Sequence, residues 1–91
     1  MAELTPDQIK AMLPSVEGWK KQSAAIARTY EFKDFAAAMQ FVNRVAQLAE
    51  AANHHPDIDI RWNKVTLTLA THSKGGLTQN DFDLAKQIDA I

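Results

Sequence analysis

Two runs of alternating apolar and polar residues, separated by a short break, constrain the fold of this chain more than any other feature. DIDIRW begins at residue 57 and KVTLTLATH begins at residue 64. Such alternation is typical of strands with one buried side, and the break at residues 62–64 suits a hairpin turn. We therefore expect an antiparallel hairpin whose apolar side carries Ile58, Ile60, Trp62, Val65, Leu67 and Leu69.

A short helix is predicted near the beginning of the chain, in LTPDQIKAML. Thr5 is a good N-cap, Pro6 suits the first helical position and Gln8 completes a capping box. Pro14 ends this helix because proline lacks a backbone N–H. The next two segments, GWKKQ and AAIARTYEF, predict a second pair of strands.

A long helix is predicted in FAAAMQFVNRVAQLAEAAN, residues 35–53. Asp34 can cap its beginning, Asn53 suits a C-terminal cap, and Pro56 cannot continue it. Helical spacing predicts an apolar stripe on this helix, made of Phe35, Ala38, Met39, Val42, Ala46 and Ala49.

A last helix is predicted in GGLTQNDFDLAKQIDAI, after the flexible Gly75-Gly76 pair. The order of elements is then α-β-β-α-β-β-α. This order predicts an α+β fold, with a four-stranded antiparallel sheet and three helices packed on one face. With 91 residues, we expect a single domain over residues 1–91.

Composition excludes several classes of protein. The formal net charge of −1 leaves no basic surface for nucleic acid or for a membrane surface. The absence of cysteine excludes disulfides, thiolate metal sites and cysteine nucleophiles. No run has the length of a membrane span, and the beginning of the chain lacks the apolar core of a signal peptide. We therefore expect a soluble cytoplasmic protein.

The three histidines are predicted to meet at one end of the sheet. If the second hairpin turns near Asn63, residues whose numbers sum to about 126 lie opposite one another, as His54 and His72 do. His55 is adjacent to His54, and the Gly75-Gly76 loop beside them lets a ligand approach the backbone.

Other residues near this end have two interpretations. Asp81 lies three residues after Thr78, so TQND is also a capping box in which aspartate replaces the usual glutamate. Trp62 suits turn or core packing as well as stacking on a ligand. Glu50 suits a solvated surface as well as a site.

Three imidazoles in one place suggest either a zinc ion or proton transfer. Zinc accepts three histidines, but adjacent residues in an extended or turn segment point in different directions, which makes His54 and His55 poor joint ligands. With an ordinary pKa near 6.5, one imidazole can act as an acid and another as a base. From the residues alone we expect an acid–base site or a polar binding pocket, without a metal.

A family resemblance joins these residues into one pattern. The spaced series is Glu50, His54, His55, Pro56, Trp62, His72 and Asp81. It closely resembles the signature of the pterin-4a-carbinolamine dehydratases, also called the dimerisation cofactor family. WNKVTLTLATH and GGLTQNDFDLA are similar to the family's second hairpin and last helix. One position departs from the pattern, because Ile58 stands where animal relatives carry an aromatic residue.

The resemblance implies a fold, an activity and an assembly. The fold is α+β, and the assembly is a homodimer or homotetramer. The activity is the elimination of water from a 4a-hydroxytetrahydropterin, which gives a quinonoid dihydropterin and serves tetrahydrobiopterin-type cofactor recycling. The substrate is a small pterin, and the chemistry requires no cofactor.

The resemblance also implies roles for single residues. His54 and His72 match the general acid and base, in either order, and His55 matches a histidine that contacts substrate and shares the proton transfer. Asp81 matches a carboxylate that orients a histidine or binds the pterin. The other positions implied in substrate binding are Pro56, Glu50 and Trp62.

Two other functions fit the same resemblance. In animals the family also acts as a dimerisation cofactor that stabilises a homeodomain transcription factor, which would make this chain a protein-interaction or coactivator module. A pterin-binding accessory protein is the other alternative.

Overall fold

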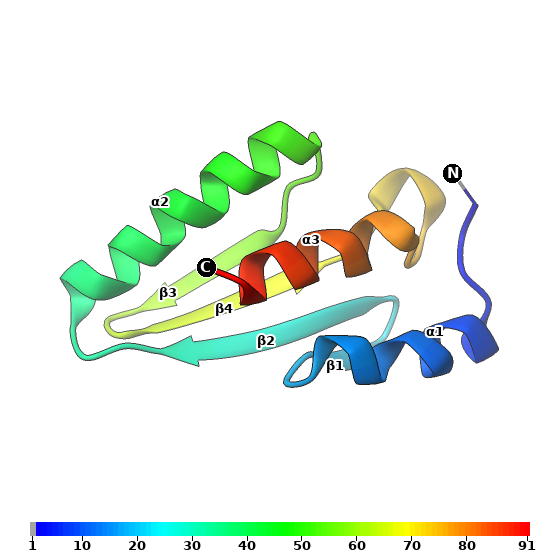
Figure 1. Ribbon diagram of the computed structural model, residues 1–91, viewed down its shortest axis with the longest axis horizontal. Coiled ribbons are helices and arrows are strands. Elements are labelled where there is room, and N and C mark those ends of the chain that lie inside the picture. Colours follow the sequence, from blue (N-terminus) through cyan, green and yellow to red (C-terminus); the bar gives the residue numbers. More distant parts are fainter. Residues whose placement is uncertain (1) are drawn as a thin grey trace.

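The computed structural model describes residues 2–91, and its elements follow the predicted order (Figure 1). In chain order they are α1 (Pro6–Met12), the 3-10 helix η1 (Leu13–Val16), β1 (Lys20–Gln22), β2 (Ala25–Glu31), α2 (Phe35–Ala52), β3 (Asp57–Arg61), β4 (Lys64–Leu69), the 3-10 helix η2 (His72–Lys74) and α3 (Gln79–Asp89). The prediction of an α+β fold with three α-helices and a four-stranded antiparallel sheet is confirmed.

The strands are ordered β1-β2-β4-β3 in the sheet, and each neighbouring pair is antiparallel. One face of β4 is fully buried, through Val65, Leu67 and Leu69. Thr66 and Thr68, which alternate with them, are only half-buried. The helices pack against the apolar face and complete the core with Ala38, Val45, Phe82, Leu84, Ala85 and Ile88.

Helix α1 begins as its sequence predicts. The Thr5 hydroxyl accepts a hydrogen bond from the backbone N–H of Gln8 at 3.2 Å, and the Gln8 side chain accepts one from the Thr5 N–H at 2.8 Å. Pro6 occupies the first turn. The helix stops at Met12, and Pro14 lies in the single 3-10 turn that follows.

Helix α2 has the predicted caps, but the predicted apolar stripe is partly wrong. Asp34 accepts a hydrogen bond from Ala37 N at 2.8 Å. Ala38 and Ala49 are buried as expected, whereas Phe35 and Ala46 are exposed. Val45 is buried in place of Ala46, because the face that packs on the sheet is rotated by about one residue. Helical spacing alone does not predict this rotation, because the helix carries alanines on more than one of its faces.

The β3–β4 hairpin has a two-residue turn at Trp62 and Asn63, between the paired residues Arg61 and Lys64. Trp62 adopts a left-handed φ of 51°. The Asn63 side chain and backbone both bond Phe32, with Nδ2 donating to its carbonyl and the Asn63 carbonyl accepting from its N–H, each at 2.8 Å. The turn is thereby tied to the segment that leads from β2 into α2.

The C-terminal end of α3 is tied to the first half of the sheet through Asp89. Its carboxylate accepts hydrogen bonds from the indole N–H of Trp19 at 3.0 and 3.1 Å, from Arg28 at 3.1 Å and from the Tyr30 hydroxyl. The Arg28 guanidinium also lies over the Tyr30 ring, 4.6 Å from its centroid. Burial, together with the nearby Asp89 carboxylate, raises the pKa of Tyr30 well above its usual value.

None of the helices formed by residues 2–91 is both long enough and apolar enough to span a membrane.

Candidate active site

The site is centred on a contact between His54 and Asp81, which are 27 residues apart in the chain. The imidazole Nε2 of His54 lies 2.5 Å from Oδ1 of Asp81. The Asp81 side chain is completely buried, and the His54 side chain retains 11% exposure. A carboxylate only accepts hydrogen bonds, so Nε2 of His54 carries a proton, and Nδ1 is the ring nitrogen that does not contact Asp81.

The other oxygen of Asp81 is held from two sides. Oδ2 accepts a hydrogen bond from the Thr71 hydroxyl at 2.9 Å and from the backbone N–H of Thr78 at 2.9 Å. The latter bond belongs to the capping box at the start of α3, so the structural interpretation of Asp81 is confirmed. Because the carboxylate lies in the first turn of α3, the helix dipole also favours its negative charge. Asp81 therefore caps a helix and contacts a histidine at once.

The end of α2 places His54 against Asp81. Asn53 adopts the left-handed conformation, with φ 49° and ψ 43°. Its N–H bonds the carbonyl of Glu50, and the N–H of His54 bonds the carbonyl of Ala49. This pair of bonds is a Schellman motif, which reverses the chain tightly after a helix. It turns His54 back toward α3, and Pro56 then leads into β3.

His55 faces a different partner. Its Nε2 is hydrogen-bonded to Oε2 of Glu50, one turn back on α2. Both side chains are largely exposed, at 55% for His55 and 77% for Glu50. The two adjacent histidines thus have different environments. His54 is mostly buried and contacts an aspartate, whereas His55 is largely exposed and contacts a glutamate.

His72 lies at the same end of the molecule, just after β4. It begins the 3-10 helix η2 rather than ending a strand, and it is exposed. It lines a pocket of about 290 Å³ together with the β1–β2 turn and the diglycine loop. Gly75 in this loop has a φ of +70° and open space around it.

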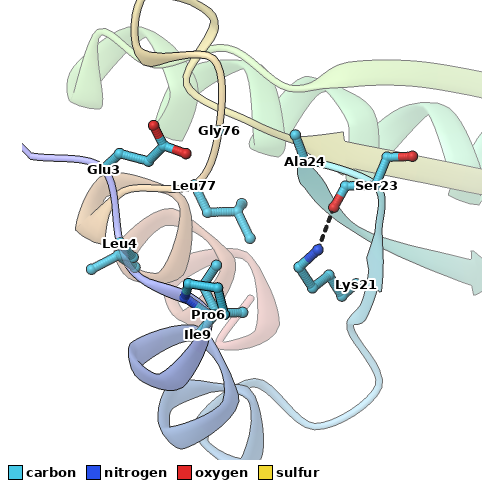
Figure 2. Close-up of a pocket in the computed structure, with 9 residues that line it drawn as sticks. All are labelled: Glu3, Leu4, Pro6, Ile9, Lys21, Ser23, Ala24, Gly76 and Leu77. Atoms are coloured by element: carbon cyan, nitrogen blue, oxygen red, sulfur yellow. Dashed lines mark hydrogen bonds between the residues drawn. The ribbon is translucent and has the colours of Figure 1, made fainter.

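A second pocket, of about 220 Å³, adjoins the first and shares Ser23, Ala24 and Gly76 with it. Figure 2 shows Glu3 on one side of this pocket and Lys21 on the other, where Lys21 Nζ donates to the carbonyl of Ser23 at 2.5 Å. Gly76 is closely approached here, since a Cβ at this position would lie 2.5 Å from the Glu3 carboxylate.

The observed register explains why His54 and His72 are not direct partners. Asp57 pairs with Thr68 and Arg61 with Lys64, so paired residue numbers sum to 125 rather than 126. Continued past the ladder, this register sets Thr71 opposite His54. A shift of one residue exchanges the two faces of a strand. The hydroxyl that reaches Asp81 is accordingly that of Thr71.

Thr71 is the site residue that the sequence analysis missed. The signal was present in the alternation, because Val65, Leu67, Leu69 and Thr71 fall on one side of the strand and His72 falls on the other. Thr71 is held in place by a bridge to Gly76, whose carbonyl accepts from Thr71 N at 3.0 Å.

Trp62 lies away from the histidines within one chain. It occupies the β3–β4 turn and is 66% exposed. Figure 1 shows this turn at the end of the molecule where α2 begins, whereas α3 begins at the other end. The five residues of β3 separate the two ends by about 16 Å. Of the interpretations of Trp62, its place in the turn is the one that this position supports.

In the part of the chain that the structure covers, residues 2–91, no three histidine or acidic side chains are grouped closely enough to hold a metal ion. The arrangement instead offers two imidazole–carboxylate pairs and a third imidazole in a pocket. An imidazole backed by a carboxylate can take up and release a proton near neutral pH.

Comparisons with known proteins point to one family. The family model for pterin 4 alpha carbinolamine dehydratase matches residues 2–91. The chain belongs to this family. A protein of Acidobacterium capsulatum, provisionally named a pterin-4-alpha-carbinolamine dehydratase, is 58% identical over 91 residues, which cover all of this chain and 99% of that protein. A provisionally named member from Mycobacterium avium is 50% identical over 91 residues, covering all of this chain and 97% of that protein.

Two solved structures resemble this member of the family. The crystal structure of a transcriptional coactivator/pterin dehydratase from Brucella melitensis superposes with a TM-score of 0.92 and 38% identity, covering 97% of this chain and 96% of that one. A pterin dehydratase-like protein, identified as a RuBisCO assembly factor in the alpha-carboxysome, has a TM-score of 0.66 and 22% identity, covering 79% and 83%. The second similarity shows the shared fold alone.

Proposed function

We propose that this chain is a hydro-lyase that eliminates water from a 4a-hydroxytetrahydropterin and releases a quinonoid dihydropterin. The buried contact between Asp81 and His54 carries the proposal, because it holds a proton-transfer group in one orientation. The family of the chain supplies the class of substrate.

The reaction needs two proton transfers. The C4a–O bond breaks as the lone pair of the neighbouring ring nitrogen forms a C=N double bond. One proton joins the departing hydroxide, which leaves as water, and one proton leaves a pterin nitrogen. Hydroxide is a poor leaving group until it is protonated, so a positioned acid and a positioned base both accelerate the step.

The histidines divide these roles in the proposal. His54 exchanges one proton at Nδ1, while its Nε2 is hydrogen-bonded to Asp81. His72, which lines the pocket beside the diglycine loop, exchanges the other proton. His55 contacts the substrate at the exposed side, where Glu50 orients it. Pro56 shapes the segment that carries both adjacent histidines.

We also propose that the protein acts in tetrahydrobiopterin-type cofactor recycling in the cytoplasm, as a homodimer or homotetramer. Strand β3 supports self-association, because it is an edge of the sheet and its Ile58 is exposed. Light scattering after size-exclusion chromatography measures the molar mass directly. A single species at the mass of one chain, 10.1 kDa, would contradict the assembly.

The first test is the rate of dehydration of freshly made 4a-hydroxytetrahydropterin, followed by ultraviolet absorbance against a buffer blank. Wild type should accelerate the reaction, and a His54→Ala/His72→Ala double variant that remains folded by circular dichroism should not. Lys74→Ala is the matched control, because this exposed side chain lies on the same 3-10 turn as His72. A wild-type rate equal to the blank would contradict the proposal.

An interaction module is the second candidate function. It is favoured by the similar protein from Brucella melitensis, which is described as a transcriptional coactivator as well as a pterin dehydratase. A wild-type chain that gives no acceleration, yet is folded and binds a protein partner equally well in the double histidine variant, would support this function instead.

A further inference from the structure

We propose that Thr71 is a positioning residue, whose hydroxyl orients the Asp81 carboxylate and thereby strengthens the preference of His54 for a proton on Nε2. The proposal deepens the dehydratase function proposed above and rests on it for its catalytic consequence. Its structural part concerns only Thr71, Thr78, Asp81 and His54.

The direction of the hydrogen bonds follows from the chemistry of the groups. The Thr71 hydroxyl lies 2.9 Å from Oδ2 of Asp81 and 2.8 Å from the Thr78 hydroxyl. A hydroxyl has one proton and a carboxylate has none to give, so Thr71 donates to Asp81 and accepts from Thr78. The hydrogen bonds therefore all run in one direction: the Thr78 hydroxyl donates to Thr71, and the Thr71 hydroxyl donates to Asp81.

Each oxygen of the Asp81 carboxylate then has its own hydrogen-bond donors. Oδ2 receives the Thr71 hydroxyl and the Thr78 backbone N–H, while Oδ1 is left for Nε2 of His54. Asp81 is fully buried, so no water replaces a missing donor without a rearrangement. Hydrogen bonds in such a chain polarise and strengthen one another.

The backbone holds Thr71 independently of this chain. Its N–H bonds the carbonyl of Gly76 in an isolated bridge, and its carbonyl accepts from Lys74 N at 2.9 Å. A substitution that removes only the hydroxyl therefore tests the orientation of Asp81 and leaves the backbone anchors of this segment in place.

The test compares Thr71→Val, which keeps the shape and removes the hydroxyl, with Thr71→Ser, which keeps the hydroxyl. Thr66→Val is the matched control, because Thr66 on β4 also makes a 2.8 Å hydroxyl–hydroxyl contact, with Thr29, but reaches no carboxylate. Nitrogen-15 NMR of the imidazoles gives the ratio of the two neutral tautomers of His54. Only three histidines need to be assigned.

Wild type and Thr66→Val should hold the neutral His54 ring with its proton on Nε2. Thr71→Val should lower the ratio of the Nε2–H to the Nδ1–H tautomer by about fivefold, a factor matching the net contribution of one hydrogen bond. In the dehydration assay kcat should fall by roughly tenfold with KM nearly unchanged, as expected for a partner that orients a catalytic group. Thr71→Ser should restore both quantities.

Two results would overturn the proposal. One is a Thr71→Val tautomer ratio equal to that of Thr66→Val, whatever the activity. The other is a Thr71→Ser ratio that departs from wild type, and this variant decides the matter if Thr71→Val does not fold. A tautomer shift in Thr71→Val, alongside a wild-type rate equal to the buffer blank, would support the positioning role and refute the dehydratase function.

Discussion

The two ends of helix α3 each carry an aspartate that gathers hydrogen-bond donors from distant parts of the chain. At the first turn, Asp81 is fully buried and contacts the imidazole of His54. At the last turn, Asp89 keeps 23% exposure and contacts Arg28, Trp19 and Tyr30.

The difference lies in the donors rather than in the carboxylates. Arginine stays protonated, indole does not titrate, and the pKa of Tyr30 is raised further above its usual value. The cluster around Asp89 therefore serves to hold α3 on the sheet. The cluster around Asp81 instead holds an imidazole, which is the kind of group that the proposed dehydration requires.

The same substitution at the two ends should give opposite results. Asp81→Asn should lower kcat for dehydration by about 10²- to 10⁴-fold, the range that a positioned acid or base contributes, because an amide no longer forces the proton onto Nε2 of His54. The measurement is steady-state dehydration at constant protein concentration, with the fold checked by circular dichroism. A folded Asp81→Asn variant with wild-type kcat would show that the two clusters do not differ in function.

Asp89→Asn should act on stability and leave the kcat of folded protein unchanged. The amide keeps one acceptor oxygen for three donors, and Trp19 is almost completely buried, so a lost partner there is costly. We expect the free energy of unfolding to fall by about 1–3 kcal/mol. Urea denaturation measures this loss. A drop in kcat as large as that of Asp81→Asn would remove the distinction between the two ends.

The pH dependence of stability should sharpen the same contrast. In the unfolded chain, the tyrosine hydroxyl has a pKa of about 10. Because the pKa of Tyr30 is raised in the folded state, the folded protein still keeps the phenol proton at pH values at which the unfolded chain has lost it. The stability contributed by this group is therefore complete below about pH 10 and declines as the pH rises above it, by at most about 1.4 kcal/mol per pH unit. Tyr30→Phe should lack this decline in urea denaturation between pH 9 and pH 11. Equal slopes in both proteins would contradict the assignment.

The smallest effect is expected at the exposed pair. Glu50→Gln should change the free energy of unfolding by less than about 1 kcal/mol, because both Glu50 and His55 are largely in solvent and such pairs contribute little. Denaturation at low and at high salt measures this. A larger loss would indicate that Glu50 has a structural role like that of Asp89.

Local signals in the sequence were sufficient for the order of the helices and strands and for the helix caps. Thr5, Asp34 and Asn53 cap the helices where their side-chain chemistry predicted, and the β3–β4 turn falls at residues 62 and 63. These features depend on hydrogen bonds between residues a few positions apart, so the sequence contains all the partners. The capping box at Asp81 was predictable for the same reason.

Contacts between elements were predictable only in part. The convergence of His54 and His72 on one end of the sheet followed from the hairpin, but a register change of one residue gave the inward position to Thr71. The rotation of α2 that buries Val45 rather than Ala46 was likewise not encoded in local spacing. Such small shifts cost little locally, and the packing of whole faces against each other decides between them.

The sequence by itself determined the order of the elements, their caps, the hairpin and the family pattern that contains the histidines. The tertiary structure decided that His54 contacts Asp81 and that His72 lines a pocket beside the diglycine loop. The physical reason is distance along the chain. Caps and turns satisfy backbone groups within a few residues, whereas the carboxylate that orients His54 comes from 27 residues away and meets it only when α2, β4 and α3 pack together.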